Sequence, residues 1–544
     1  MPFPPFEPCF PVFWGETVRE HGGRTFAVLG DDRIRYDEAD ARSAILARAL
    51  AASGVGKGTR VGLLFPNGPD WLCAWLATVR IGAVAVPINT FQPPRELGWM
   101  LRHADIDTLL TVDELLGADL LERIEACAPS LASAPTNEPL LVPELPYLRR
   151  VVVWGPSNRS WTIGQARFVE RAGTVPSEVL RALEDEVRPA DWMLILYSSG
   201  STSEPKGAIH THGSVIRHPY NLNSMRDIEI GEVIYSPMPW FWVGGLVFVL
   251  VSAMHRGGML LCEKRFEPGE TLALLERERA TSAQGWPHFS KALVEHPSFP
   301  ERDLSSIRTG NLYHLLPESE RVADPGLHAT SLGMTESCGP HTFDRMELEL
   351  PERLRGSFGR SVEGIEHKVV SPETGAPVAP GELGELCVRG YSLAQGLYKR
   401  EREEVFEPDG FYRTGDSGHF SEDGHLFFQG RLGDMIKTAG ANVTPREVEL
   451  VLESFDEVSE AFVVGVAHPE RGENVAAAVV LLDGATSDPE TLRKRLKVEL
   501  SAYKLPRHWW LTGGDELPMT DSGKIDKRRL RSVLEASIAR GDIA

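Results

Sequence analysis

The chain has 544 residues, more than a single hydrophobic core needs, so we expect two or more domains. Hydrophobic residues make up 42% of it and charged residues 25%, which is typical of a globular protein and excludes a disordered or fibrous chain. The formal net charge of −20 argues against nucleic acid as a partner, so any phosphate site needs its own basic side chains.

The sequence carries no sign of secretion or membrane insertion. Its six cysteines are scattered, without a C-x-x-C pair or metal-ligand spacing, which predicts reduced thiols. The first residues lack the basic and apolar segments of a signal peptide. The longest apolar run, 240–254, is too short to span a bilayer and contains Gly244 and Gly245. We therefore expect a cytoplasmic protein without a membrane span, and a buried helix over 240–254.

Strands and helices alternate in the first part of the chain. Apolar residues at helical spacing predict helices over 37–53 and 70–80, and short apolar runs predict strands over 61–65 and 83–87. This alternation is typical of right-handed crossovers and a parallel sheet. The stretch 128–146, rich in proline, alanine and serine, predicts a surface loop.

The pattern changes towards the C-terminus. Short strands over 367–370 and 386–389 predict a β-rich sub-lobe, and after Arg431 a compact α+β unit follows. This unit is expected to have a helix beginning at 444–447, strands over 461–466 and 475–482, and a helix beginning at 488–489.

The predicted fold class is therefore α/β. We expect a large N-terminal domain over 1–430, built of parallel α/β sub-lobes plus the β-rich sub-lobe. A hinge over 431–433 and a small mobile α+β domain over 434–544 complete the prediction.

A loop rich in hydroxyl groups follows the apolar strand predicted over 192–197. Residues 198–207 read SSGSTSEPKG: glycine lets the backbone come close to a phosphate, hydroxyls and amides donate to its oxygens, and a lysine supplies charge. The spacing of a P-loop is absent. A flexible linker is the alternative, but the strand before and Pro-Lys-Gly after favour phosphate binding. The candidate ligands are Ser198, Ser199, Gly200, Ser201, Thr202 and Lys206.

At this point the sequence resembles the adenylate-forming superfamily, which includes acyl-CoA synthetases, aryl-CoA ligases, luciferases and peptide-synthetase adenylation domains. The likeness covers nearly the whole chain in order, and the 198–207 loop is similar to the family's pyrophosphate-binding loop. The other matching segments are SLGMTE at 331–336, GELGEL at 381–386, YRTGD at 412–416, GRLGDMIK at 430–437 and PMTDSGKI at 518–525. One such segment is weak, but six in the right order are specific.

The resemblance implies roles in ATP binding and in formation of an acyl-AMP. It places Thr335 and Glu336 beside the phosphates, with Glu336 as a hard oxygen ligand for Mg²⁺. Asp416 would accept hydrogen bonds from the ribose, and Arg431 would reach the same sugar. Lys524 would bridge the carboxylate and the α-phosphate, stabilising charge in the transition state. The implied catalytic residues are thus Lys524, Thr335 and Glu336, and Gly333 joins the ATP- and AMP-binding set.

Each of these motifs has a simpler interpretation when it is taken alone. The 335–336 pair fits a helix cap, and Arg413 with Asp416 fits a surface ion pair. Lys524 fits a basic C-terminal tail that continues to Arg531.

The implied reaction has two steps and uses ATP, Mg²⁺ and coenzyme A. A carboxylate attacks the α-phosphate and releases pyrophosphate; the small domain then rotates about the hinge at Gly433, and the thiol of coenzyme A releases AMP. Residues 440–443 are similar to the loop that lines the pantetheine tunnel. The residues assigned to coenzyme A are Lys437, Gly440 and Ala441.

The acyl group is predicted to be bulky and hydrophobic. Segment 237–245 is similar to the one that lines the carboxylate pocket, and Trp240, Phe241 and Trp242 offer a large apolar area there; Gly310 is assigned to the same pocket. No aspartate is present to hold a substrate ammonium. The sequence therefore predicts a cyclic or aromatic carboxylic acid, and the alternative is that the three aromatic rings belong to the core.

The chain departs from the family pattern at several positions. Ser203 replaces a glycine of the phosphate loop, and Leu332 stands where an aromatic ring stacks on adenine. Trp242 replaces a histidine found in many relatives, Gly433 replaces aspartate or lysine at the hinge, and 311–314 is bulkier than expected.

Several of these departures lie on the ATP side and open a second hypothesis. In it the protein mainly forms the thioester from an acyl-AMP supplied by an upstream enzyme. Two further alternatives are an acyl-AMP ligase that loads a carrier protein and a non-catalytic nucleotide- or acyl-binding protein. The joint presence of Lys206, Glu336, Asp416, Arg431 and Lys524 argues against the last. The sequence leaves a homodimer open.

Overall fold

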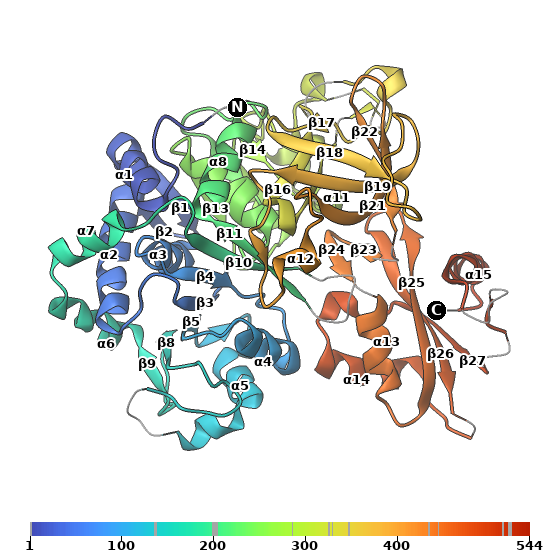
Figure 1. Ribbon diagram of the computed structural model, residues 1–544, viewed down its shortest axis with the longest axis horizontal. Helices are drawn as coiled ribbons and strands as arrows, with labels where there is room; N and C mark the ends of the chain where they lie inside the picture. Colours follow the sequence, from blue (N-terminus) through green and yellow to red (C-terminus); the bar gives the residue numbers. More distant parts are fainter. Residues whose placement is uncertain are drawn as a thin grey trace.

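The computed structural model describes the chain except for residues 1–2, 135–138, 199–204, 286, 322, 325–326, 329, 346–348, 433–435, 444, 483, 514–515, 520–524 and 544. Figure 1 shows the larger N-terminal part in blue to orange, with the darker orange and red C-terminal unit beside it. The structure is mixed α/β, which confirms the predicted fold class.

Short apolar strands of the first 200 residues form the centre of an eight-stranded sheet, ordered β20-β11-β10-β4-β3-β5-β8-β9. Its strands from β10 to β9 pair in parallel, with helices α3 and α4 supplying crossovers, whereas β11 and β20 add an antiparallel edge. The strands are β3 (Arg60–Leu64), β4 (Val84–Pro87), β5 (Thr108–Val112), β8 (Arg150–Trp154), β9 (Thr162–Gly164), β10 (Trp192–Ser198), β11 (Lys206–Thr211) and β20 (Gly396–Leu397).

A second, five-stranded sheet packs against the first through a shared core. It has the order β14-β12-β13-β1-β2 and is parallel except for the β1–β2 pair. Its strands are β1 (Thr25–Leu29), β2 (Asp32–Arg35), β12 (Val233–Tyr235), β13 (Met259–Cys262) and β14 (Ser282–Ala283). The core between the sheets contains α3, in which every residue except Asp70 is buried.

Two helices of this large part, α2 and α3, match the helices predicted over 37–53 and 70–80. The α-helices of the large part are α1 (Phe10–His21), α2 (Tyr36–Ala52), α3 (Pro69–Val79), α4 (Pro94–His103), α5 (Leu120–Cys127), α6 (Gln165–Val169), α7 (Ser177–Asp185), α8 (His212–Asn223), α9 (Ser252–Met254), α10 (Pro268–Arg277), α11 (Pro287–Val294) and α12 (Arg402–Val405).

The β-rich sub-lobe follows, as expected, and consists of antiparallel strands. A three-stranded sheet carries β15 (Leu332–Met334), β16 (Gly339–Phe343) and β17 (Arg360–Ser361). A four-stranded sheet carries β18 (Ile365–Val370), β19 (Gly384–Gly390), β21 (Tyr412–Phe420) and β22 (Leu426–Arg431).

The C-terminal unit is built around the long β25–β26 hairpin; β27 pairs in parallel with β26 on the side away from β25, and β23–β24 joins β26 on the same side at Gly472. Helices α13 and α14 pack on one face of this sheet and α15 on the other, as Figure 1 shows. The elements are β23 (Ile436–Thr438), β24 (Ala441–Val443), α13 (Pro445–Glu453), β25 (Val458–His468), β26 (Gly472–Leu481), α14 (Pro489–Glu499), β27 (His508–Thr512) and α15 (Lys527–Arg540).

The apolar run 240–254 is only partly helical, contrary to expectation. A π-helical segment, Gly244–Val251, leads into α9, and Trp240 precedes it. A Cβ on Gly245 would lie 2.2 Å from the carbonyl oxygen of Pro239, so glycine is needed for this close approach. None of the helices in the described part of the chain is both long and apolar enough for a membrane crossing.

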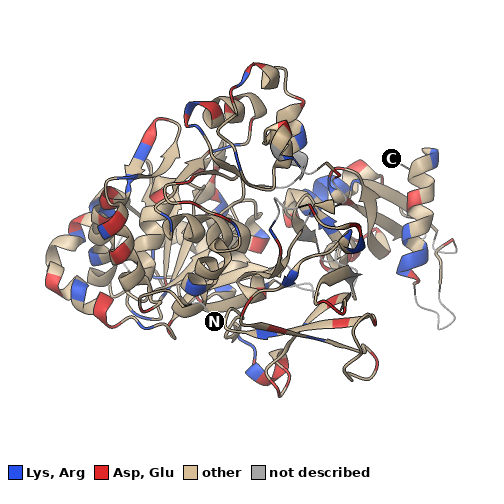
Figure 2. Ribbon diagram, turned by 90° about the horizontal axis from the view of Figure 1, so that it is seen from above, with Lys and Arg blue, Asp and Glu red and all other residues tan. Residues whose placement is uncertain are grey.

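Figure 2 shows that positions of both charge signs are interspersed along the ribbon of both parts of the molecule. Helix α15, near the C-terminus, begins with Lys527, Arg528 and Arg529, so the basic run that offered the alternative interpretation of Lys524 forms the first turn of a helix.

Candidate active site

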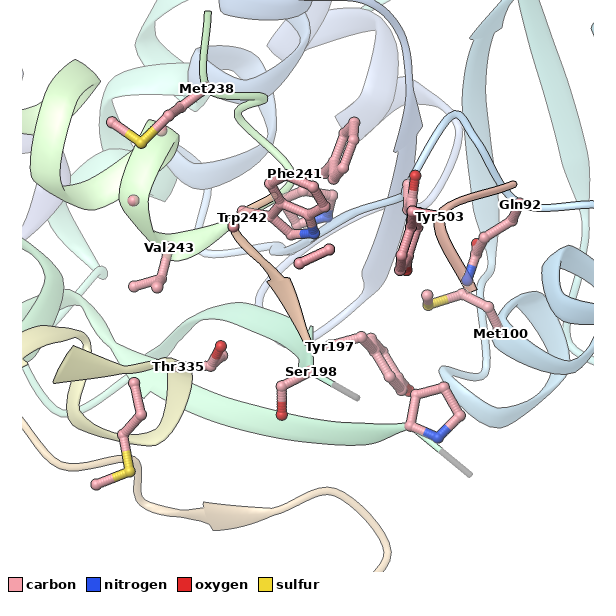
Figure 3. Close-up of a pocket in the computed structure, with 18 of the residues that line it drawn as sticks. Gln92, Met100, Tyr197, Ser198, Met238, Phe241, Trp242, Val243, Thr335 and Tyr503 are labelled. Atoms are coloured by element: carbon pink, nitrogen blue, oxygen red, sulfur yellow. The ribbon is translucent and has the colours of Figure 1, made fainter. Parts of the chain in front are cut away.

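A cavity of about 320 Å³ lies where the large and small domains meet. Figure 3 shows the rings of Phe241, Trp242 and Tyr503 around it, with Ser198 and Thr335 at another part of its wall. From the large domain its lining residues are Pro87, Asn89, Gln92, Met100, Tyr197, Ser198, Pro205, Met238, Phe241, Trp242, Val243, Gly244, Gly245, Gly333, Met334 and Thr335, and from the small domain Gly440, Ala441, Tyr503 and Lys504.

The predicted phosphate loop joins two antiparallel strands at the edge of this cavity. Ser198 is the last residue of β10 and pairs in register with Lys206, the first residue of β11. The two ends of the loop are therefore fixed by the sheet. The predicted ligands Ser199, Gly200, Ser201 and Thr202 lie outside the described residues, as does Ser203.

Thr335 and Glu336 begin a short 3₁₀ turn that follows β15, and Thr335 lines the cavity. The Nε2–H of buried His210 donates to the carbonyl oxygen of Thr335 at 2.8 Å. Burial lowers the pKa of His210 to about 4, so the ring is neutral at pH 7 and its orientation is set by that carbonyl. The hydrogen bond from His210 therefore fixes the backbone of this turn.

Two hydroxyl groups from other elements lie close to the Glu336 carboxylate. Its Oε1 lies 3.4 Å from the Ser198 hydroxyl and 3.4 Å from the Tyr412 hydroxyl. Gly333, nearby in β15, also lines the cavity; a Cβ there would lie 2.7 Å from the backbone of Gly339, so the tight β15–β16 pairing needs glycine.

Lys206 and Tyr412 also share a second cavity of about 320 Å³, which Arg413 of β21 lines with them. The side chain of Arg413 pairs with Glu385, so it does not form the surface ion pair with Asp416 that the sequence allowed.

Asp416 and Arg431 lie directly opposite each other in the β21–β22 ladder. Asp416 is 3% exposed, and its backbone N–H donates to the Thr414 hydroxyl at 3.0 Å. The register thus brings together the two residues that the sequence assigned to one sugar, although neither lines the cavity at the domain junction.

The three aromatic residues of the acyl segment have different surroundings. Phe241 and Trp242 line the cavity and contact each other edge to face, with ring centroids 5.2 Å apart. Trp240 is 2% exposed, and its ring packs edge to face on Trp71 of α3. Trp240 is therefore a core residue, which corrects its assignment to the acyl pocket.

Gly310 and Leu332 also lie away from the cavity lining. Gly310 has φ +119°, and a Cβ there would lie 2.0 Å from the carbonyl oxygen of Ala283, so its role is a close backbone approach. Leu332 is 5% exposed and packs with Leu386 and Leu426 in the β-rich sub-lobe. The side chain at 332 thus belongs to a core instead of offering a surface to adenine.

The small domain presents Gly440 and Ala441, the residues assigned to coenzyme A, to the cavity. Gly440 has φ +80°, a conformation that favours glycine. Lys437 is exposed and lies 4.5 Å above the ring of Phe428, outside the cavity lining. Gly433 and Lys524 lie outside the described residues.

The sequence did not point to Tyr503 and Lys504, which complete the small-domain side of the cavity. Lys504 does not stand out locally, because the stretch 500–511 also contains Arg507 and His508. Gln92, Met100 and Tyr197 were also missed, because they carry no motif and reach the cavity from the segment before α4, from α4 and from β10.

Comparison with known protein families gives two matches along the chain. Residues 14–398 match the model described as AMP-binding enzyme, and residues 447–524 match the AMP-binding enzyme C-terminal domain.

Curated relatives match almost the whole chain. A putative acyl-CoA synthetase of Bacillus subtilis is 31% identical over 526 residues and covers 95% of each chain. A feruloyl-CoA synthase of Amycolatopsis is 32% identical over 522 residues, again covering 95% of each. An indoleacetate–CoA ligase of Aromatoleum aromaticum is 29% identical over 526 residues and covers 93% of this chain and 95% of its own.

Solved structures also match almost the whole chain. The amide bond synthetase McbA of Marinactinospora thermotolerans has a TM-score of 0.78 and 25% identity, over 96% of this chain and 99% of its own. ATP-bound MatB of Rhodopseudomonas palustris has a TM-score of 0.64 and 25% identity, over 96% of this chain and 98% of its own.

Proposed function

Because the chain belongs to the AMP-binding enzyme family and is an AMP-forming acid–thiol ligase, we propose that it joins a cyclic or aromatic carboxylic acid to coenzyme A through an acyl-AMP. The observation that carries this proposal is the single cavity in which Ser198, Thr335, the rings of Phe241 and Trp242, and Gly440 meet.

The aromatic lining supports a bulky acid. Phe241, Trp242 and Tyr503 surround the cavity together with Met238 and Met100, so a small polar acid would leave apolar surface without a partner. The relatives named for feruloyl-CoA and indoleacetate act on acids that contain aromatic rings.

The nucleotide side supports the first step. In this proposal Lys206 and the 198–204 loop hold the phosphates, and Asp416 and Arg431 hold the ribose. The carboxylate of Glu336, beside the Ser198 hydroxyl, suits Mg²⁺, which usually keeps waters and is bound by one or two carboxylates plus substrate phosphates. Bound there, Mg²⁺ would neutralise phosphate charge, while Lys524 would stabilise the reacting α-phosphate.

The small domain supports the second step in the orientation seen here. Gly440 and Ala441 face the cavity, whereas Ile525, which follows Lys524, packs with Leu530 and Leu534 on the opposite face of the small-domain sheet from α13 and α14. We assign this orientation to attack by the coenzyme A thiol, and a rotated one to acyl-AMP formation.

The test is product detection by mass spectrometry with ATP, Mg²⁺, coenzyme A and a panel of acids. We expect acyl-CoA and AMP from cyclic or aromatic acids, and much less from acetate. A preference for acetate or for an amino acid contradicts the substrate class, and a product on a carrier protein alone contradicts coenzyme A as acceptor.

A further inference from the structure

The carboxylate of Glu96 in the large domain contacts two residues of the small domain. Glu96 lies in α4, and its side chain accepts from the Ser501 N–H at 3.1 Å, the Ser501 hydroxyl at 2.7 Å and the Lys504 ammonium at 3.0 Å. The same ammonium donates to Glu447 of α13 at 2.8 Å. We call Glu96, Glu447, Ser501 and Lys504 the docking cluster.

The docking cluster is almost entirely shielded from water. The side chains of Lys504, Glu96 and Glu447 are 4%, 9% and 11% exposed. Burial alone would lower the pKa of Lys504, but Tyr503, Glu447 and Glu96 raise it above its usual value, so the ammonium stays charged. A buried charge that loses one of its partners is strongly destabilised, so the cluster favours the orientation in which all contacts form.

A second pair across the same junction is different in kind. Arg95, next to Glu96, lies 3.4 Å from Glu499, but these side chains are 59% and 36% exposed. Solvent screens such pairs, and they commonly contribute about 0–1 kcal/mol. The exposed pair therefore serves as an internal control for the buried cluster.

The docking cluster is directly connected to the cavity wall. Ser501 precedes the short 3₁₀ turn Ala502–Lys504, whose last residue is Lys504, and the turn packs against β24. Tyr503 and Lys504 of that turn and Ala441 of β24 all line the cavity. The position of Glu96 thus fixes the part of the wall that the small domain supplies.

We propose that Glu96 and Lys504 are positioning residues for the thioester-forming step, because their contact holds the small domain with Gly440 and Ala441 at the cavity. This inference rests on the proposed function, since it requires that the two steps use different orientations of the small domain. In the rotated orientation the Glu96–Lys504 contact is broken, so it contributes nothing to acyl-AMP formation.

The test compares Glu96→Gln with the matched control Glu499→Gln. Glutamine keeps the shape of the side chain and an oxygen for Ser501 but removes the charge that faces Lys504. We measure ATP–pyrophosphate exchange for the first step and thioester formation from supplied acyl-AMP for the second. We expect Glu96→Gln to slow thioester formation about ten-fold, which corresponds to 1.4 kcal/mol, and to leave exchange within about two-fold. Glu499→Gln should change neither rate by more than about two-fold.

Two further measurements separate docking from general damage. The double variant Glu96→Gln with Lys504→Met should form thioester no more slowly than the slower single variant. The reason is that each single variant already removes the same contact between Glu96 and Lys504. Amide hydrogen exchange over 94–103 and 501–504 should increase in Glu96→Gln and not in Glu499→Gln, whether or not an acid substrate is known.

Equal slowing of both half-reactions by Glu96→Gln, or unchanged thioester formation together with unchanged hydrogen exchange, overturns the inference. If the unmodified protein catalyses neither half-reaction, that result would instead contradict the proposed function. The hydrogen-exchange difference would then still show whether Glu96 docks the small domain.

Discussion

The two sides of the cavity are held in different ways. The large-domain side consists of strand ends and the turn that follows β15: Ser198 is paired in the β10–β11 ladder, and Thr335 is held by His210. The small-domain side, with Ala441 and Tyr503, is held by side chains that meet across the domain junction. One side is fixed by the sheet, whereas the other exists only while the domains are docked. This difference suits a site in which one wall must be exchanged between two steps.

The largest expected effect comes from removing Lys524, the residue that we assign to the cavity in the first step, when the small domain has rotated. Lys524→Ala should reduce acyl-AMP formation by about two to three orders of magnitude, because a donor placed at developing charge is lost. Thioester formation from supplied acyl-AMP should be largely retained. ATP–pyrophosphate exchange and single-turnover thioester assays measure the two rates.

The control for Lys524 is Arg528→Ala, an exposed basic residue at the start of α15. It should change neither half-reaction. Equal loss of both rates in Lys524→Ala would show a structural role, and equal effects of the two variants would support the alternative of a basic tail.

The second prediction concerns the acid stability of the large domain. Burial lowers the pKa values of His210, His218 and His367 to about 4, and all three lie in the large domain. Unfolding restores a pKa near 6.5, so this contribution to stability is complete above pH 6.5 and is lost as the pH falls towards 4. Each histidine should destabilise the fold by about 1 kcal/mol at pH 5.5.

Thermal unfolding between pH 7.5 and 5.5 measures this slope. His210→Gln keeps an N–H for the Thr335 carbonyl but does not titrate, so its slope should be shallower by about 1 kcal/mol. Trp240→Phe, a buried substitution of the large domain that removes no titratable group, is the control and should leave the slope unchanged. Identical slopes in all three proteins would contradict the prediction.

Much of the large-domain side could be predicted from sequence because its elements are local. The strand over 192–197 and the loop after it are consecutive in sequence, and β10 covers Trp192–Ser198. Likewise, the glycine and hydroxyl pattern of 331–336 leads directly to the turn at Thr335. In each case the chemistry and the structural element share one short segment.

The parts that could not be predicted depend on contacts between distant segments. Trp240 and Trp242 are two residues apart, and only the packing on Trp71 decides that the first enters the core. Glu96 and Lys504 are separated by 408 residues, and neither belongs to a motif. Sequence patterns report local periodicity, so a docking contact of this kind leaves no trace in them.

The third prediction uses the contrast between the two tryptophans. Trp242→Phe removes ring area from the cavity, so kcat/KM for the preferred aromatic acid should fall about ten-fold while larger acids gain relative to it. Trp240→Phe should lower the unfolding temperature and leave the order of substrates unchanged, because its ring packs in the core. Competition between pairs of acids measures the order. A changed order in Trp240→Phe and not in Trp242→Phe would reverse the assignment.

The smallest expected effect concerns Ser203, which lies outside the described residues. If its place in the phosphate loop needs positive φ, the Cβ of serine costs about 1 kcal/mol. Ser203→Gly should then raise ATP–pyrophosphate exchange roughly five-fold and leave thioester formation unchanged, because that step needs no pyrophosphate. Leu332 is best retained, since a larger ring would overpack the core around Leu386 and commonly costs about 1–3 kcal/mol.

Ser203→Ala is the control, because alanine keeps the Cβ and removes the hydroxyl. It should behave like the unmodified protein if backbone strain is the cause, and like Ser203→Gly if the hydroxyl is the cause. The measurement also decides between the main proposal and a protein that chiefly forms the thioester from a supplied acyl-AMP. Exchange in the unmodified protein as fast as overall turnover would mean that the phosphate loop is not limiting, and that both walls of the cavity serve a complete two-step ligase.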